Sequence, residues 1–217
     1  LADGSGFVLT SERDGWNHLY LYDMAARAPK LLTNGTWVVK EVIGMDPNET
    51  FLVVEGTDLI LPGNPKGANE THLYHVAIPT GKVTRLTNEP GTHHGQLSTD
   101  GTTIIDTWSS TSMPGQVVLR DSRTGKILET LLTSKDPLAG ITVGSIELLT
   151  IPGANGDHLN ARLIKPSGFD QTKRYPVLIY VYNGPHVQLV TNSFLAGASL
   201  WMLEAAERCY LVWTVDG

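Results

Sequence analysis

The sequence has few cysteines, no cluster of basic residues and no long apolar run. A single cysteine, Cys209, excludes an internal disulfide framework and a metal site built from several cysteines. The 16 Lys and Arg residues are scattered among 22 Asp and Glu residues, so a nucleic-acid-binding surface is not expected. Runs of about 18 apolar residues are missing, so no transmembrane helix is expected.

The composition that remains is typical of a globular protein with many turns. Hydrophobic residues make up 41% of the 217 residues, which is enough for a packed core. The 22 glycines and 12 prolines indicate frequent turns. Residues 211–217 have the pattern of an apolar strand that stops at its own turn, so we expect the sequence to be part of a longer protein.

A repeated pattern of short strands fills the first two thirds of the sequence. His-Leu-Tyr at residues 18–20 returns at residues 72–74, and Leu-Thr-Asn at residues 32–34 returns at residues 86–88. Both intervals are 54 residues, so the two copies are in phase. A looser third copy lies at residues 116–126, where Thr-Gly-Lys matches residues 80–82. Such self-similarity is the signature of a repeat architecture.

The repeat units have the length and strand content of propeller blades. Residues 37–87 and 92–133 each hold about four strand candidates, and three more strands precede residue 34. Four antiparallel strands per repeat of about forty residues predict a β-propeller. The sequence therefore predicts about two and three-quarter blades in residues 1–138. Because so few blades cannot close a ring, we expect further blades upstream.

The pattern changes after residue 138, where residues 139–217 predict the start of an α/β-hydrolase sheet. A hairpin is expected at residues 144–165. The apolar run 175–182 predicts a strand buried on both faces, and 210–215 predicts a second one. A helix is expected between them at residues 199–208, with Leu200, Leu203 and either Trp201 or Ala206 on its apolar side. Cys209 is expected to be a buried free thiol.

The segment with the clearest catalytic potential is 181–186, Val-Tyr-Asn-Gly-Pro-His. In α/β-hydrolases the loop after an early strand supplies part of the oxyanion hole. The chemistry needs a donor aimed at the oxygen that becomes negative, and the hydroxyl of Tyr182 is such a donor. The alternative is an ordinary Gly-Pro turn with Tyr182 packed on the core.

A metal site at His93 and His94, with Asp100 or Asp106, is a weaker hypothesis. Adjacent residues of a strand point to opposite sides, so one ion cannot readily take both imidazoles. We expect a loop at the edge of a blade instead, and no metal or cofactor.

Four segments carry a family resemblance that spans nearly the whole chain. They are residues 11–20 (SERDGWNHLY), 34–39 (NGTWVV), 173–185 (KRYPVLIYVYNGP) and 213–217 (WTVDG). In this order they resemble the penultimate-blade signature, the turn after it, the first hydrolase strands with a Tyr-x-Gly-Pro loop, and the strand before an Arg-Gly-Ser. These are features of the dipeptidyl peptidase IV branch of the prolyl oligopeptidase family of serine peptidases. Pro185-His186 is more similar to bacterial dipeptidyl or prolyl tripeptidyl peptidases.

The resemblance implies a propeller that caps a hydrolase domain with a Ser-His-Asp triad. It implies that Tyr182 donates to the oxyanion, whereas the nucleophile, the Asp and the His lie outside this chain. In agreement, the sequence has no Gly-x-Ser-x-Gly, since residues 197–201 lack the second glycine. No cofactor is implied.

The resemblance also implies an activity, a substrate class, an oligomeric state and a cellular location. The expected activity is release of N-terminal dipeptides from Xaa-Pro peptides, so the partners are peptides with proline near the N-terminus. A homodimer at full length and a periplasmic or secreted location are expected. A prolyl tripeptidyl or acylaminoacyl peptidase stays open, because the residues that anchor the peptide amine are not in this sequence. The alternative of another class is a non-catalytic propeller that binds proteins.

Overall fold

The chain divides into two compact units, and each is described by itself. The computed structural model describes residues 1–58, 65–154, 156, 158–182, 184 and 187–216. The first unit comprises Leu1–Trp108 and Gln116–Thr133, and the second comprises Ser109–Gly115 and Ser134–Gly217. Within the described residues, no helix has the length and apolar character needed to cross a membrane. The predicted assignment of residues 1–138 and 139–217 to a propeller and a hydrolase domain stays a prediction.

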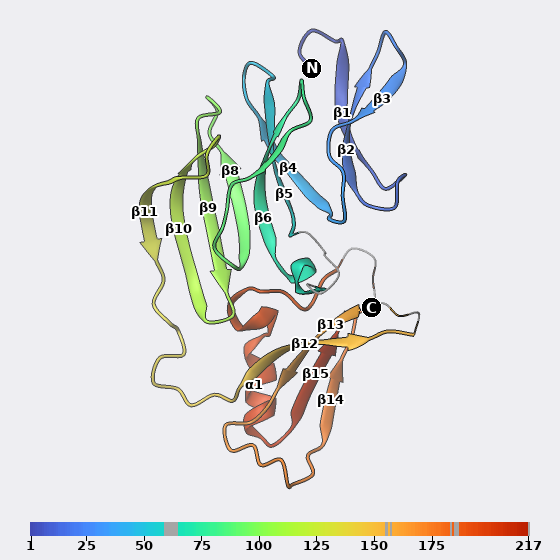
Figure 1. Cartoon of the computed structure of the whole chain (residues 1–217). Helices are drawn as coiled ribbons and strands as arrows, with labels where there is room; N and C mark the ends of the chain where they lie inside the picture. Colours follow the sequence, from blue (N-terminus) through green and yellow to red (C-terminus); the bar gives the residue numbers. More distant parts are fainter. Residues whose placement is uncertain (59–64, 155, 157, 183, 185–186, 217) are drawn as a thin grey trace. The chain divides into compact units, whose positions relative to one another are not determined.

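The first unit is built from blades that follow one another along the chain and consist mainly of antiparallel strand pairs (Figure 1). A first blade of three strands comprises β1 (Gly6–Ser11), β2 (His18–Asp23) and β3 (Ala28–Leu31). A second blade comprises β4 (Val39–Met45), β5 (Phe51–Thr57), β6 (Thr71–Ala77) and β7 (Val83–Arg85), with a 3-10 turn, η1 (Pro65–Asn69), before β6. A third comprises β8 (Thr92–Leu97), β9 (Thr103–Ser110), β10 (Met113–Asp121) and β11 (Ile127–Thr133), of which Ser109–Gly115 belong to the second unit. Strand β8 pairs in parallel with β6, with Thr92 opposite Thr71. The predicted class, a partial propeller of four-stranded blades, is confirmed.

The sequence repeat corresponds to a repeated hydrogen-bond pattern. In the first blade the hydroxyl of Thr33 accepts from the Leu19 amide at 2.9 Å and lies 3.1 Å from Nδ1 of His18. In the second blade Thr87 does the same, at 3.1 Å from the Leu73 amide and 3.0 Å from Nδ1 of His72. Each threonine therefore ties the end of its blade to the strand β2 or β6 beside it, which explains why the two motifs recur together.

The apolar cores of this unit lie between adjacent blades. One cluster joins Leu19 and Leu32 of the first blade to Trp37, Val54 and Tyr74 of the second. Another cluster joins the second and third blades; it holds Phe51, Val53, Leu73, Leu86 and Ile104. Blade-on-blade packing of this kind is how propellers bury their sheet faces.

Two glycines allow the blades to approach one another. Gly81 (φ +70°) and Gly125 (φ +73°) lie in the Thr-Gly-Lys turns of the second and third blades. A Cβ at Gly81 would lie 3.1 Å from the carbonyl oxygen of Leu32, and one at Gly125 would overlap that of Leu86. Both the positive φ and the close contact favour glycine. The repeat therefore also fixes how each blade meets the preceding one.

The second unit is a four-stranded sheet covered by a short helix. The strand order is β12 (Ile146–Pro152), β13 (His158–Ile164), β15 (Leu211–Val215) and β14 (Val177–Tyr180). The β12–β13 hairpin is antiparallel, whereas β14 and β15 are parallel, with Tyr180 opposite Thr214. Helix α1 (Leu200–Glu207) follows a 3-10 turn, η2 (Phe194–Gly197), and packs Met202, Leu203 and Ala206 against Ile164 and Val212. The expected hairpin, helix and strand 210–215 are thus present.

Three expectations for this unit are wrong. Strand β14 is not buried on both faces, because it is the edge strand of the sheet; Val177 and Ile179 are 55% and 64% exposed. On helix α1, Leu203 and Ala206 are buried as expected, whereas Leu200 is exposed, and so is Trp201, the alternative to Ala206. At 100° per residue, Leu200 and Trp201 lie roughly 110° or more from the centre of the buried stripe. Cys209 is exposed rather than buried, because it occupies the left-handed turn (φ +67°) between α1 and β15.

Candidate functional site

Tyr182 lies two residues after the end of β14, in the second unit. Strands β14 and β15 are parallel, so their carboxyl ends share one edge of the sheet. Ligands of open α/β sheets bind at this edge. The Tyr182 side chain is 55% exposed, so it is not packed on a core as the alternative interpretation requires. An exposed phenol hydroxyl at this edge can donate a hydrogen bond to an anionic oxygen.

Gly184 leaves room for the ring of Tyr182. A Cβ at Gly184 would overlap ring atom Cε1 and would lie 3.1 Å from the hydroxyl oxygen of Tyr182. The glycine of the predicted Tyr-x-Gly-Pro loop therefore permits the position that the tyrosine occupies. The remaining loop residues that the sequence singled out, Asn183, Pro185 and His186, lie outside the described residues.

Two side chains without a motif of their own, those of Asp216 and Arg162, contact the backbone at Leu189 and Val190. The carboxylate of Asp216 accepts the amides of Leu189 and Val190, each at 2.9 Å. Arg162 is 1% exposed and donates to the carbonyl of Leu189 at 3.0 Å. The one signal in the sequence was an arginine in the middle of an expected strand. If such a residue is buried, its charge needs partners, because charged side chains are rarely buried without them.

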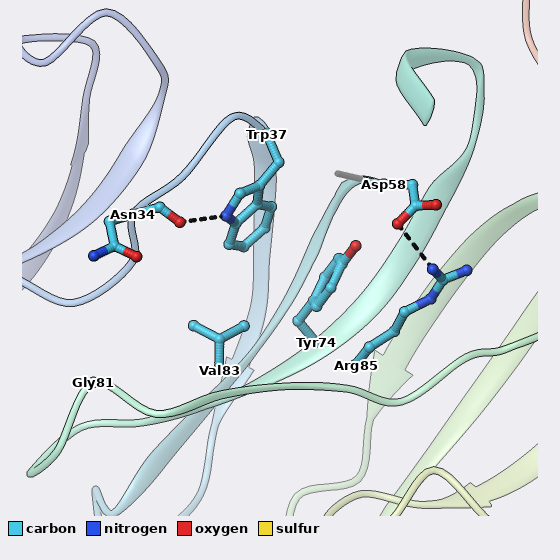
Figure 2. Close-up of a pocket in the computed structure, with 7 residues that line it drawn as sticks. All are labelled: Asn34, Trp37, Asp58, Tyr74, Gly81, Val83 and Arg85. Carbon is cyan, nitrogen blue, oxygen red and sulfur yellow. Dashed lines mark hydrogen bonds and ion pairs between the residues drawn. The ribbon is translucent and has the colours of Figure 1, made fainter. Parts of the chain in front are cut away.

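The first unit has a pocket of about 370 Å³ between its first and second blades (Figure 2). Trp37 and Tyr74 form one wall, with ring centroids 4.8 Å apart, and burial raises the pKa of the Tyr74 hydroxyl. Trp37 donates to the carbonyl of Asn34 at 2.7 Å, and Tyr74 donates to that of Thr57 at 2.8 Å. The polar atoms of the aromatic wall are therefore already engaged within the protein.

Three side chains with metal-ligand chemistry lie together in the second blade, and one of them, Asp58, lines this pocket. The ligand atoms of Asp58, Glu70 and His72 lie within 4.8 Å of one another. However, the guanidinium of Arg85 lies 2.8 Å from Asp58 Oδ1 and 2.8 Å from His72 Nε2. This cation supplies the positive charge that a metal would bring, and its repulsion opposes a second cation. We therefore interpret the group as an ion-pair cluster.

His93 and His94 point to opposite sides, as the sequence predicted, but they lie in strand β8 and not in a loop at a blade edge. His93 is fully buried, with Nδ1 3.0 Å from Asp106 and Nε2 2.9 Å from the carbonyl of Glu89. Arg120 donates to the same Asp106 carboxylate at 2.7 Å. His94 is exposed and contacts Glu55 at 3.1 Å. Each imidazole has its own carboxylate partner, so the pair does not form one ligand set.

Comparisons with known proteins match the whole length of the chain. Residues 1–115 match the model of the family "Dipeptidyl peptidase IV (DPP IV) N-terminal region". The "Probable dipeptidyl peptidase 4" of Aspergillus flavus is 28% identical over 216 residues, which are 97% of this chain and 27% of that protein. The chain therefore spans about a quarter of the length of this curated relative.

Two crystal structures have the same fold over the same length. A candidate dipeptidyl aminopeptidase IV of Bacteroides ovatus superposes with a TM-score of 0.86 and 31% identity, covering 98% of this chain and 32% of that one. Dipeptidyl peptidase 4 of Porphyromonas gingivalis superposes with a TM-score of 0.82 and 28% identity, covering 98% and 29%. Both units of the chain thus have counterparts in these proteins.

Proposed function

This chain belongs to the dipeptidyl peptidase IV N-terminal region family, and we propose that it is part of a serine exopeptidase that releases dipeptides from Xaa-Pro peptides. The observation that carries the proposal is the extent of the likeness. It covers 97% or more of the chain in relatives named dipeptidyl peptidase 4, and it continues from the blades into the α/β unit.

In this proposal the two units have different roles. The first unit supplies blades of the propeller, and the second supplies the first strands of the hydrolase sheet. Tyr182 donates its hydroxyl proton in a hydrogen bond to the oxyanion that forms when the serine attacks the substrate carbonyl. Its exposure at the carboxyl end of a parallel strand supports this role. The serine, its histidine base and the orienting aspartate come from sequence outside these residues.

We also propose that the substrates carry proline near the N-terminus, that the full-length protein is a homodimer, and that it is periplasmic or secreted. These three proposals rest on the family resemblance of the loop and blade segments. The dipeptidyl peptidase proposal has three competing alternatives. They are a prolyl tripeptidyl peptidase, an acylaminoacyl peptidase and a non-catalytic binding protein.

The first experiment tests the class of protein and its cleavage rule. The full-length protein is treated with a fluorophosphonate probe and assayed on matched Xaa-Pro, Xaa-Xaa-Pro and N-acylated peptide substrates. We expect one labelled serine and release of dipeptides. Release of tripeptides only would replace the dipeptidyl rule, and release of N-acylated residues would assign an acylaminoacyl peptidase. A folded protein without labelling or turnover would overturn the enzyme proposal in favour of a binding protein.

The second experiment tests Tyr182. In the full-length protein Tyr182→Phe removes one hydrogen-bond donor and keeps the ring, so kcat should fall roughly 10²–10³-fold. Tyr175→Phe is the matched control; this tyrosine accepts the Asp170 amide at 2.9 Å and lies before β14. We expect its kcat to be unchanged. Wild-type turnover in Tyr182→Phe would contradict the oxyanion role.

A further inference from the structure

Asp216 binds two consecutive backbone amides after Tyr182. Its Oδ1 accepts from Leu189 and its Oδ2 accepts from Val190, both at 2.9 Å. The Asp216 amide in turn donates to the carbonyl of Asn160 at 3.0 Å. Because both carboxylate oxygens are used, this contact fixes the direction of the bound backbone as well as its position.

Arg162 holds the same backbone from inside the unit. One nitrogen, Nη1, donates to the carbonyls of Leu189 at 3.0 Å and Ala196 at 2.6 Å. The other, Nη2, donates to the hydroxyl of Thr214 at 3.0 Å. Arg162 is 1% exposed; burial lowers its pKa, and the charge of Asp216 opposes that shift. A buried cation with these acceptors leaves Leu189 little freedom to move.

Strand β15 therefore fixes the chain on both sides of Tyr182. Before Tyr182, residue Tyr180 is paired with Thr214 of β15 in parallel register. After it, Leu189 and Val190 are bound by Asp216, the residue that follows β15. Val190 is fully buried, so this second attachment is a packed one. The two attachment points, Thr214 in β15 and Asp216 directly after it, are two residues apart, so the end of this strand is a common support for Tyr180 and Leu189.

We propose that Asp216, supported by Arg162, is a positioning residue for Tyr182. This inference rests on the proposed function, in which the Tyr182 hydroxyl stabilises the oxyanion. The carboxylate does not touch substrate. It holds the backbone amides of Leu189 and Val190, and so restricts where the phenol hydroxyl of Tyr182 meets the reacting carbonyl. Misplacement of a catalytic group by about 1 Å costs up to about 100-fold in rate, so a positioning residue has a measurable effect.

The test is a double-mutant cycle in the full-length protein with an Xaa-Pro substrate. Asp216→Asn retains size and one acceptor, and we expect kcat to fall roughly 10-fold with KM within about twofold. In a Tyr182→Phe background the same substitution should change kcat less than about twofold, since the group that it positions is gone. Asp170→Asn is the matched control; this carboxylate accepts Thr172 in an exposed turn of the same unit, and we expect wild-type kinetics.

The outcomes separate this inference from the proposed function. An unlabelled, inactive wild-type protein contradicts the proposed function itself. If Tyr182→Phe lowers kcat but Asp216→Asn does not, or if Asp216→Asn costs the same in both backgrounds, the positioning role is wrong and the proposed function stands. If Asp216→Asn does not fold, Asp216→Glu replaces it in the same cycle, because it keeps both oxygens and displaces them by one methylene. Equal losses in both backgrounds would again overturn the positioning role.

Discussion

At the scale of single residues, the balance between burial and a carboxylate partner sets the sign of a histidine's effect on stability. Burial lowers the pKa of His72, further aided by the charge of Arg85, and the hydrogen bond to Glu70 only partly opposes this. The hydrogen bond to Glu55 raises the pKa of His94 and outweighs its desolvation. His72 is therefore stabilising as a neutral imidazole, and His94 as a cation.

These two shifts predict opposite effects of pH on the free energy of unfolding. The unfolded chain takes up a proton at His72 near pH 6.5, whereas the folded chain does so only at lower pH. The contribution of His72 to the free energy of unfolding is therefore lost on acidification. The contribution of His94 is present below 6.5 and is lost as pH rises through its raised pKa. Between about pH 8 and 5.5, His72→Gln should make the fall in stability shallower, and His94→Gln should make it steeper.

Urea unfolding of the 217-residue chain at a series of pH values measures both slopes. The His94 effect should be the smaller one, because two thirds of its side chain is exposed and solvent screens the pair. The two variants serve as each other's controls. Slopes that change in the same direction in both variants would contradict the assignment of charge states.

At the scale of structural elements, one threonine closes each of the first two blades. Thr33 and Thr87 are 1% and 0% exposed, and each accepts the amide of the leucine in the neighbouring strand. Valine has the same shape without the hydroxyl. The substitution therefore leaves a buried N–H without its acceptor and removes one partner of the imidazole Nδ1.

Thr33→Val and Thr87→Val should each lower the free energy of unfolding by about 1–3 kcal/mol, the cost of an unsatisfied buried donor. Chemical denaturation of the chain measures the loss. Thr130→Val in the exposed strand β11 is the matched control and should change stability by less than about 0.5 kcal/mol. A loss at Thr87 alone would mean that the two repeats are not energetically equivalent.

The sequence predicted these elements well because their signal is local and repeated. Strand alternation, the turns and the 54-residue phase are all present in the order of residues 18–34 and 72–88. The burial of β14 and the face of α1 depend instead on which elements lie over them. Composition suggested two covered faces for residues 175–182, whereas the strand lies at a sheet edge with one neighbour. Local patterns do not contain that information.

At the scale of the whole molecule, the candidate site combines a residue that a local motif reveals with residues that only the folded sheet brings to it. Tyr182 was found from its motif and its position after a strand. Arg162 and Asp216 were not, since the hydrogen bonds that link them to Leu189 join residues 27 positions apart in either direction. Such contacts exist only once the sheet order β13-β15-β14 has formed. Motif reasoning therefore singled out Tyr182, the proposed oxyanion donor, and missed the residues that we propose to position it.

The connection after β11, one of the places where the chain passes between the two units, is also open to a direct test. Residues 134–137 are exposed and lie between the end of β11 and the start of β12, outside any strand. From Leu138 onward the chain is attached to the second unit, because Leu138 packs against its core and its amide is bound by Asp136 at 2.8 Å. Exposed backbone without ladder hydrogen bonds is the preferred site of proteolysis.

Limited trypsin digestion of the chain should therefore cut after Lys135 before it cuts after Lys126. Lys126 is exposed as well, but its carbonyl accepts the Asp121 amide at 2.9 Å, so its backbone is held in a turn. Mass spectrometry of early time points identifies the cuts. Lys135→Gln should remove the first pair of fragments, whereas Lys126→Gln should leave it unchanged. An early cut after Lys126 would mean that the last strand of the third blade, β11, opens more readily than the connection, and the compact first unit would then end before that strand.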